Sequence, residues 1–319
     1  MKHNRIFGLF AVLLCLIMLL ILPLSAFAAE SDTSGSLAVS FSIDDNAVAD
    51  VTFNVYRVAD ENYQPVGAYT AYPVVLKDLS SDELGIASTT LAAYTVRDGI
   101  SADRSDVTNI YGYVRFDDLQ KGLYLVIGEM FIDGDTVYNP LPFLVSIPSY
   151  DTDGQALYGI VAKPKYDSWP TDKKLERSVK KIWDDGIYEI IRPTQITAQL
   201  LQDGSIADEV VLSEENGWSY SWKDLDPSHV WLVVEKYVPD NYTVTVDQQG
   251  TALIITNTII FTSDDFLNPG GGDPPPSTDT PILPNTGQLW WPVPILLFAG
   301  ALMLLIGAAI SRKNSNEDA

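Results

Sequence analysis

The sequence is almost without cysteine and histidine. Its one cysteine, Cys15, lies in an apolar stretch near the N-terminus, and His229 is the only histidine after residue 28. The chain beyond that point cannot form a disulfide, and it offers no basis for a Cys–His or Ser–His–Asp catalytic set or a zinc site. We therefore expect no metal, no cofactor and no enzyme that acts on a separate substrate.

Basic residues are also scarce. The chain has 20 lysines and arginines against 42 aspartates and glutamates, a formal net charge of −22. Such a charge disfavours nucleic acids and anionic membranes as partners, and solubility outside a cell is enough to explain it. The length of 319 residues suits two domains between the two chain ends.

The N-terminal segment has the organisation of a secretory signal peptide. Two basic residues precede an apolar core over residues 6–22, and Ala26-Phe27-Ala28 follows it. Small residues at these positions are typical of signal-peptidase cleavage sites. We expect residues 1–28 to be removed by cleavage between Ala28 and Ala29.

Residues 283–319 combine a short motif, an apolar run and a basic end. The motif is Leu283-Pro284-Asn285-Thr286-Gly287, and an uncharged run of 22 residues over 289–310 precedes Arg312 and Lys313. A helix of this length can cross a hydrocarbon core of roughly 30 Å, and the basic pair would stay in the cytoplasm. A simple membrane anchor explains the run but not the motif in front of it.

This arrangement resembles the cell-wall sorting signal of Gram-positive surface proteins, Leu-Pro-x-Thr-Gly. The resemblance implies that a sortase cleaves between Thr286 and Gly287 and holds Thr286 as a thioester. An amine of the peptidoglycan precursor, or a lysine of another pilin subunit, then takes the acyl group. The apolar run is then a temporary stop in the membrane and is absent from the product.

Between these ends, short apolar–polar alternations separated by Gly, Pro and Asp predict an all-β fold of two β-sandwiches. The first sandwich covers residues 29–166 and contains one inserted helix, Ser81 to Val96, with Ser80 or Ser81 as its N-cap. We expect a loop over residues 97–109. The remaining boundaries are a linker over 167–178, the second sandwich over 179–261 and an extended Pro/Gly-rich spacer over 262–282.

The two predicted sandwiches align as copies of one pattern. Residues 39–45 align with 179–185, and residues 114–129 align without a gap with 220–235. This alignment predicts the same strands in both sandwiches.

Several segments carry a resemblance to known families. In the second sandwich, the segments 181–185, 192–193, 196–204, 217–225 and 255–258 resemble the B-type repeat of collagen adhesins (Cna-B), an immunoglobulin-like sandwich. In the first, the segments 52–58, 122–126 and 142–146 resemble the N-terminal domain of sortase-assembled pilins.

The resemblance to Cna-B implies an intramolecular isopeptide bond between Lys181 and Asn257, with Glu235 as the buried acid that assists it. Strand parity agrees, because Lys181 shares a face with Trp183 whereas Lys180 faces out. A buried Lys–Glu ion pair that Asn257 caps is the alternative.

The first sandwich provides an internal contrast. Phe41 aligns with Lys181, and Lys163 stands roughly where Asn257 does, although Glu129 aligns with Glu235. We expect no bond of this type there.

Pro164-Lys165 lies at the end of the last predicted strand of the first sandwich. In shaft pilins, which this sandwich resembles, a Pro-Lys-Asn motif stands at this place and its lysine attacks the sortase thioester. Here Tyr166 replaces the asparagine. Lys165 is the candidate polymerising lysine, and a solvated lysine beside a linker is the alternative.

Together these features predict a structural protein, secreted and anchored to the wall of a Gram-positive cell. The implied partners are sortase, the peptidoglycan precursor and other pilin subunits, with the membrane engaged only before sorting. A pilin subunit, of shaft or basal kind, is the first interpretation. A singly anchored adhesin that binds host extracellular matrix is the alternative, and an enzyme ranks third.

Overall fold

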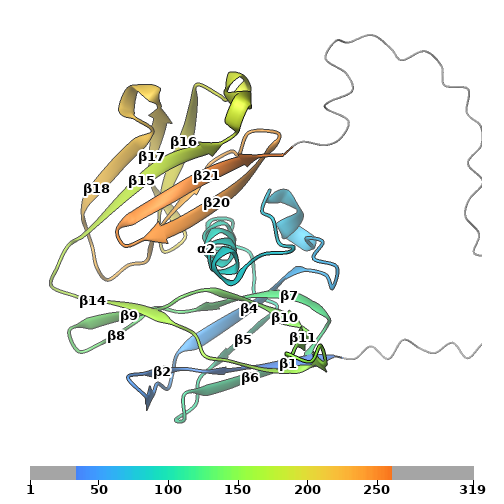
Figure 1. Ribbon diagram of the computed structural model, residues 1–319. Coiled ribbons are helices and arrows are strands. Elements are labelled where there is room, and N and C mark those ends of the chain that lie inside the picture. Colours follow the sequence, from blue (N-terminus) through green and yellow to red (C-terminus); the bar gives the residue numbers. More distant parts are fainter. Residues whose placement is uncertain (1–33, 261–319) are drawn as a thin grey trace, which may run out of the picture. The chain divides into compact units, whose positions relative to one another are not determined.

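The computed structural model describes residues 34–260, which form two sets of β-sheets with one α-helix between them (Figure 1). The predicted signal peptide, spacer and sorting signal, residues 1–28 and 262–319, lie outside the described residues. Within the described range, no helix is long and apolar enough to cross a membrane.

The first sandwich consists of a sheet with the order β13-β1-β6 and a facing sheet with the order β10-β7-β4-β5. Apolar residues at alternate positions, such as Leu37 and Val39 in β1 and Phe53 and Val55 in β4, fill the space between the sheets. The strands are β1 (Gly35–Ser40), β4 (Thr52–Ala59), β5 (Arg104–Val107), β6 (Tyr113–Leu119), β7 (Gly122–Gly128), β10 (Phe143–Ile147) and β13 (Gly159–Ala162).

Smaller sheets extend this sandwich. They are the three-stranded sheet β14-β9-β8 and the hairpins β2–β3 and β11–β12. Their bounds are β2 (Ser42–Ile43), β3 (Asn46–Ala47), β8 (Phe131–Asp133), β9 (Thr136–Pro140), β11 (Ser149–Tyr150), β12 (Ala156–Leu157) and β14 (Tyr166–Pro170). The predicted loop over 97–109 was wrong in part, because it contains β5. All four residues of β5 are exposed, so no apolar alternation marks it in the sequence.

The predicted linker over 167–178 needs correction, since most of it is strand. β14 pairs with β9, and β15 already begins at Leu175, so only residues 171–174 lie outside strands. β14 is an edge strand that ends at Pro170, a residue that sheets tolerate at their edges. Its Trp169 donates from Nε1 to the carbonyl of Pro227 at 2.8 Å, which ties this segment to the second sandwich.

The second sandwich has the immunoglobulin-like arrangement of two sheets, β18-β15-β21-β20 and β17-β16-β19. Its first and last strands, β15 and β21, are parallel neighbours. The strands are β15 (Leu175–Asp184), β16 (Gln195–Gln202), β17 (Ser205–Ser213), β18 (Ser219–Leu225), β19 (Trp231–Glu235), β20 (Tyr242–Gln249) and β21 (Ala252–Ile259). Short 3-10 helices are η1 (Gly67–Ala71), η2 (Gly186–Ile191) and η3 (Glu214–Asn216).

The predicted repeat is confirmed where the two sandwiches share strand pairing. Val39 lies opposite Val114 in β6, and Val179 lies opposite Tyr220 in β18. Both pairs of strands contain a bulge close to an aspartate with positive φ, Asp118 at 55° and Asp224 at 59°.

Helix α2 (Ser81–Arg97) matches the predicted helix closely. Ser80 is its N-cap: Glu83 N–H donates to Ser80 Oγ at 3.3 Å, and Ser80 N–H donates to the Glu83 carboxylate at 2.7 Å. This reciprocal pair satisfies two backbone donors at the start of the helix. The helix is inserted between β4 and β5, where the second sandwich has only the short β16–β17 turn.

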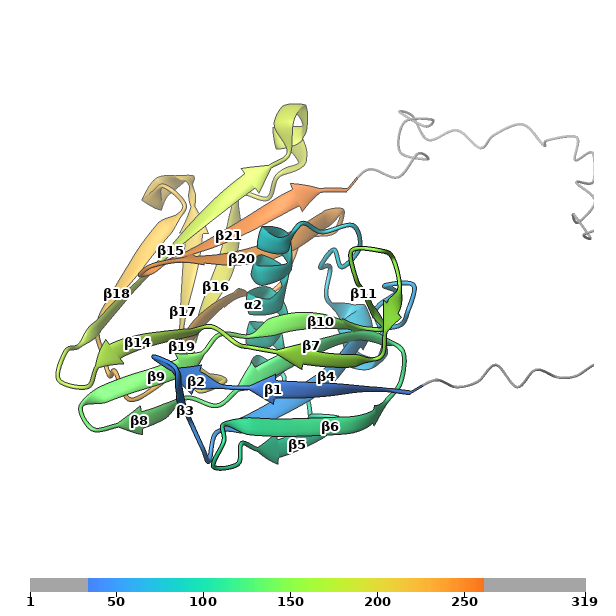
Figure 2. The ribbon, with the colours of Figure 1, turned by 60° about the horizontal axis from the view of Figure 1, so that its bottom comes forward.

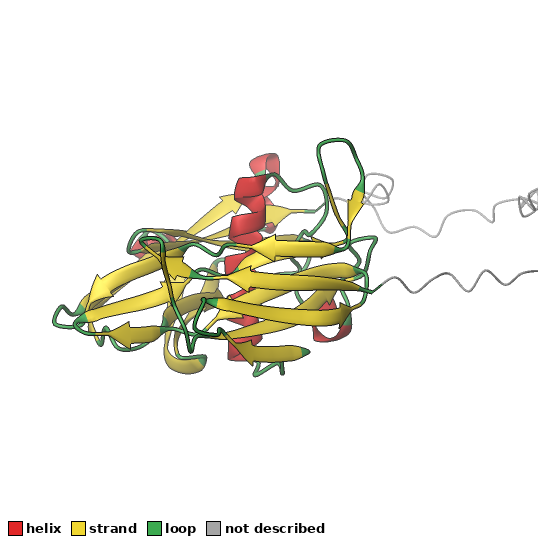
Figure 3. Cartoon of the chain, turned by 90° about the horizontal axis from the view of Figure 1, so that it is seen from below, coloured by secondary structure: helices red, strands yellow, loops and turns green. Residues whose placement is uncertain are grey.

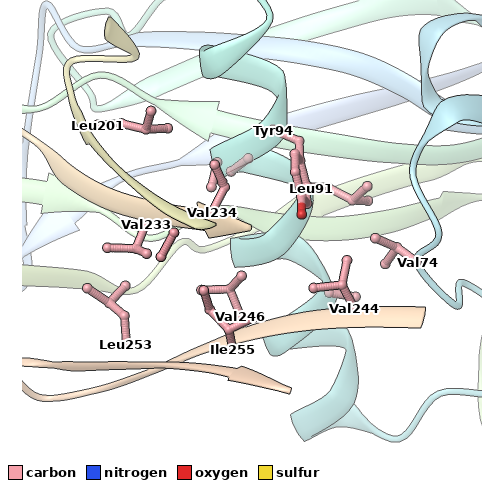
Figure 4. Close-up of a cluster of buried hydrophobic side chains, with 14 of the residues drawn as sticks. Val74, Leu91, Tyr94, Leu201, Val233, Val234, Val244, Val246, Leu253 and Ile255 are labelled. Carbon is pink, nitrogen blue, oxygen red and sulfur yellow. The ribbon is translucent and has the colours of Figure 1, made fainter. Parts of the chain in front are cut away.

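Helix α2 belongs to the hydrophobic cluster that fills the second sandwich, and this cluster also includes residues of β4 and β7 outside the inter-sheet core of the first sandwich. It packs against β7 and β10 on one side and against β19 and β20 on the other (Figure 2). Seen from below, it runs across the strands of the first sandwich (Figure 3). Leu91 and Tyr94 lie in one hydrophobic cluster with Val233 and Val244 of the second sandwich (Figure 4). The sequence predicts the helix as part of the first sandwich but does not predict its packing against the second.

The helix also completes the hydrogen bonding of β20, an edge strand. Val246 N–H donates to Thr90 Oγ1 at 2.8 Å, and Val244 N–H donates to the carbonyl of Pro73 at 2.9 Å. At the end of the helix, Gly204 has φ of +84°, and a Cβ there would lie 2.8 Å from the carbonyl oxygen of Val96. The close approach of Gly204 to the end of the helix needs glycine. The N–H donors at the edge of β20 have their acceptors in the first sandwich.

Leu91→Ala should therefore destabilise both sandwiches. Leu91 is 1% exposed, and its removal leaves a cavity in the shared cluster, which costs about 2–5 kcal/mol of the free energy of unfolding. Urea unfolding followed by tryptophan fluorescence and by circular dichroism should show the same shift in both signals. Thr89→Ala, a half-buried neighbour on the helix, is the control. A shift in only one signal would contradict the shared core.

Candidate functional site

The structure brings Lys181, Glu235 and Asn257 together inside the second sandwich. Their exposed fractions are 3%, 0% and 0%. Lys181 lies opposite Ile255 and Asn257 opposite Trp183 in the parallel pair β15–β21, so Lys181 and Asn257 are diagonal neighbours. Glu235 ends β19 in the facing sheet. The predicted parity is confirmed, because Lys180 is exposed.

The polar contacts of these three residues are few. Asn257 Nδ2 donates to Glu235 Oε1 at 3.2 Å, and Lys181 Nζ lies 3.9 Å from Glu235 Oε2. Lys181 Nζ also donates to the carbonyl of Ile182 at 3.0 Å. Among the residues described, Glu235 Oε2 and Asn257 Oδ1 have no hydrogen-bond partner although both are buried. Ionised partners would be expected to approach more closely than this.

Burial changes the proton affinities of both ionisable groups. Desolvation lowers the pKa of Lys181, and the nearby carboxylate of Glu235 opposes that shift only in part. Desolvation raises the pKa of Glu235 in the same way. Transfer of one proton from Lys181 to Glu235 then gives a neutral amine and a neutral acid. A protonated Glu235 can donate to the oxygen of the Asn257 amide, and a neutral amine is a nucleophile.

Trp183 and the ion pair between Arg192 and Asp185 lie beside Lys181. Lys181 Nζ lies 4.0 Å from the centroid of the Trp183 ring. Arg192 binds the carboxylate of Asp185 with two hydrogen bonds, at 2.6 and 2.9 Å, and Tyr242 Oη donates to the same group at 3.2 Å. These hydrogen bonds hold the pKa of Asp185 below its usual range.

The second sandwich is similar to a domain of known proteins. Residues 177–258 match the family model of the Cna protein B-type domain. This part of the chain is similar to such a domain. The match begins two residues after the start of β15 and includes nearly all of β21.

A curated relative and several solved structures are also similar. The chain is 32% identical over 119 residues to a collagen adhesin of Staphylococcus aureus, and this match covers 35% of the chain and 10% of the relative. The chain thus spans about a tenth of the length of that protein.

Among solved structures, a single B repeat unit of the Staphylococcus aureus collagen-binding surface protein has 18% identity and a TM-score of 0.26, covering 72% of this chain and 98% of that one. A shaft pilin of Lactobacillus rhamnosus has 15% identity and a TM-score of 0.26, covering 72% and 100%. A basal pilin from the same organism has 12% identity and a TM-score of 0.31, covering 68% and 85%.

The first sandwich has aromatic residues where the B-type domain has its polar site. Phe41, aligned with Lys181, packs its ring against Phe53, Phe131 and Tyr166 at centroid distances of 5.7, 6.3 and 6.2 Å. It offers no amine, as predicted.

Two of the predicted alignments in the first sandwich were shifted. Gly128 pairs with Phe53 as Glu235 pairs with Ala198, so Gly128 takes the place of the acid. A Cβ on Gly128 would lie 2.7 Å from the Phe53 ring. Glu129 is exposed and accepts a hydrogen bond from Asn54 at 3.4 Å. The ungapped alignment is wrong here because Gly128 lies nine positions after Leu119, at the end of β6, whereas Glu235 lies ten positions after Leu225, at the end of β18.

The prediction that Lys163 stands roughly where Asn257 does also needs correction. Val39 pairs with Ala162 as Val179 pairs with Leu253, so the position four residues further on, which is Asn257 in β21, corresponds to Tyr166 at the start of β14 and not to Lys163. Lys163 is exposed.

Lys165 lies between β13 and β14 and is exposed. Its backbone carbonyl accepts the N–H of Leu141 at 2.8 Å, which fixes the backbone there. Lys163 and Lys165 both line a cleft of about 1500 Å³ that also has Ser81 and Gln248 on its walls.

The cleavage site at Ala28 and Ala29 and the motif over 283–287 lie outside the described residues and stay predictions.

Sequence reasoning missed one set of residues at the site. Tyr94 and Arg97 of α2 approach the backbone of Glu235 from the first sandwich. No pattern in the sequence points to them, because the contact joins residues about 140 positions apart.

Intact-mass measurement should show that the mature chain lacks one ammonia. The expected reaction joins Lys181 to Asn257, and Glu235→Ala should restore the full sequence mass because the acid that moves the protons is lost. Lys236→Ala, a neighbour on the surface side of the strand, should leave the loss of ammonia intact. A wild-type mass equal to the sequence mass would remove the bond, and a loss of two ammonias would show a second one.

Proposed function

We propose that the protein is a structural component of a Gram-positive cell surface, a pilin subunit that sortase assembles and anchors covalently to the wall. The observation that carries this proposal is the buried Lys181–Glu235–Asn257 site in a Cna protein B-type domain. The sorting motif over 283–287 and the exposed Lys165 supply the acyl donor and the candidate amine for assembly.

The site performs a single reaction on its own chain. With Lys181 neutral and Glu235 protonated, Nζ attacks Cγ of Asn257 while the acid donates to the amide oxygen. The carboxyl group then carries the proton from the new amide nitrogen to Nδ2, and ammonia leaves. No enzyme is required, because the fold holds the reacting groups at high effective concentration.

The product suits a protein under mechanical tension. The bond would join β15, where the chain enters the domain, to β21, where it leaves. Force transmitted along the chain would pass through the new bond, and the strands between residues 181 and 257 would lie outside the path of the force.

A singly anchored adhesin is the second candidate, favoured by the similarity to a collagen adhesin. Immunoblots of wall extracts separate the two. A ladder of covalent high-mass species indicates a polymerised subunit, and a single band indicates a protein that is anchored alone.

Thr286→Ala should abolish attachment to the wall. The substitution keeps the backbone carbonyl but removes the threonine side chain of the motif that sortase would recognise, so the protein should remain in the membrane or be shed. Fractionation of wall, membrane and medium followed by immunoblotting measures this. Asn285→Ala, at the variable position of the motif, is the matched control and should be anchored normally. Normal wall incorporation of Thr286→Ala would contradict sortase anchoring.

Lys165→Arg should abolish polymers while monomer still reaches the wall. Arginine keeps the positive charge, but its guanidinium group stays protonated and is not a nucleophile. Lys163→Arg, two residues away and equally exposed, should keep the ladder. If the ladder persists in Lys165→Arg and is lost in Lys163→Arg, Lys163 is the acceptor. If both variants polymerise, Lys165 is a surface lysine.

A further inference from the structure

Helix α2 of the first sandwich contacts the backbone of the acid in the second. Tyr94 Oη donates to the carbonyl oxygen of Glu235 at 3.2 Å, and Arg97 Nη1 reaches the same oxygen at 3.5 Å. Tyr94 is 2% exposed. The Arg97 guanidinium covers its ring at 4.6 Å from the centroid, and Tyr72 stacks on it at 5.0 Å. The phenol is therefore held in one place.

The position of Glu235 in its strand makes this contact important. Glu235 is the last residue of β19, and β19 is the edge of its sheet, so β16 holds it from one side only. Helix α2 packs along β19 and β20, the two edge strands on this side of the sandwich. The backbone that carries the acid is thus fixed by a strand of its own domain and by a helix of the other.

We propose that Tyr94 is a positioning residue for the cross-link, so that the bond in the second sandwich forms at full rate only once helix α2 has docked. This rests on the isopeptide bond proposed above. Tyr94 holds the carbonyl of Glu235 and thereby the direction of its side chain toward Lys181 and Asn257. The helix also closes the side of the sandwich through which water would reach the acid.

The chemistry explains why the rate is sensitive to this contact. The bond from Lys181 Nζ to Asn257 Cγ forms as the bond from Cγ to Nδ2 breaks, and Glu235 moves the proton that leaves with ammonia. Nothing is oxidised or reduced. A displacement of about 1 Å of one reacting group can slow such a step on the order of 100-fold. Water beside Glu235 would favour the charged pair, which does not react.

The test compares Tyr94→Phe with Tyr72→Phe in the predicted mature chain, residues 29–286. Both changes remove one hydroxyl from the same aromatic cluster, but the Tyr72 hydroxyl donates to Asp98 and not to Glu235. Chain recovered unfolded in guanidinium chloride is diluted into buffer, samples are quenched in acid, and intact mass gives the cross-linked fraction over time. Tyr94→Phe should react about tenfold more slowly than wild type, the effect of one buried hydrogen bond, and Tyr72→Phe at the wild-type rate.

Two further measurements separate positioning from slower folding. Tryptophan fluorescence in an Asn257→Ala background gives the folding rate of each variant without the cross-link. The second measurement is the pH profile of the cross-linking rate. The reactive pair shares one proton, so the profile is bell-shaped. Water beside Glu235 should return both pKa values toward their ordinary range. The maximum rate should then be lower and the profile broader. Asp185, Arg192 and Arg97, which face the pair, keep their charges between about pH 5 and 9.

The outcomes are distinct. Slower cross-linking in Tyr94→Phe alone, with unchanged folding and a lower, broader profile, supports the inference. A wild-type rate in Tyr94→Phe, equal slowing in both variants, or slowing that folding fully explains would overturn it while the bond itself stands. A wild-type chain that keeps its full sequence mass would remove the bond and this inference together.

Discussion

The burial of a lysine beside a glutamate is the constraint on which the second sandwich depends. Removing a carboxylate and an ammonium from water costs several kcal/mol for each ion, and their attraction repays this only when the geometry is good. Here the groups are 3.9 Å apart and one carboxylate oxygen lacks a hydrogen bond among the described residues. An ion pair of this kind is a weak source of stability. The proposed conversion to a neutral amide would remove both charges, which would explain why these residues are buried.

The same need for a dry interior gives helix α2 its importance. The B-type domain has edge strands β19 and β20 on one side, and its own sequence supplies nothing in the described structure that covers them. The helix comes from an insertion in the first sandwich, and it brings Leu91, Tyr94 and Thr90 to that side. The first sandwich keeps its own inter-sheet core, but α2 and the cluster around it join the two sandwiches, so the arrangement differs from two independent domains on a flexible tether.

Much of this could be predicted from the sequence. Alternation and family-like segments predict the two sandwiches, and the parity of β15 predicts that Lys181 faces inward. The predicted helix, Ser81 to Val96 with Ser80 or Ser81 as its N-cap, differs from α2 by one residue at its end. These features are local, so they leave a record in neighbouring residues.

Other features could not be predicted because they are not local. β5 has no apolar side, and β14 is a polar edge strand that resembles a linker. The shift that puts Gly128, and not Glu129, in place of the acid depends on strand register, which an ungapped alignment cannot detect. Tyr94 approaches Glu235 only because two sandwiches pack together. The sequence predicts which residues face inward, but it does not show what covers the open side of a sheet.

The hydrogen bonds that β20 donates to Thr90 and Pro73 have a consequence for the order of events during synthesis. A ribosome makes the chain from its N-terminus, so α2 exists well before β20. When β20 appears, the groups that occupy its free edge are already at hand on the same molecule. A strand edge left open, even briefly, can pair with the edge of another chain. This early partner would keep neighbouring copies of the chain from joining through the edge of β20.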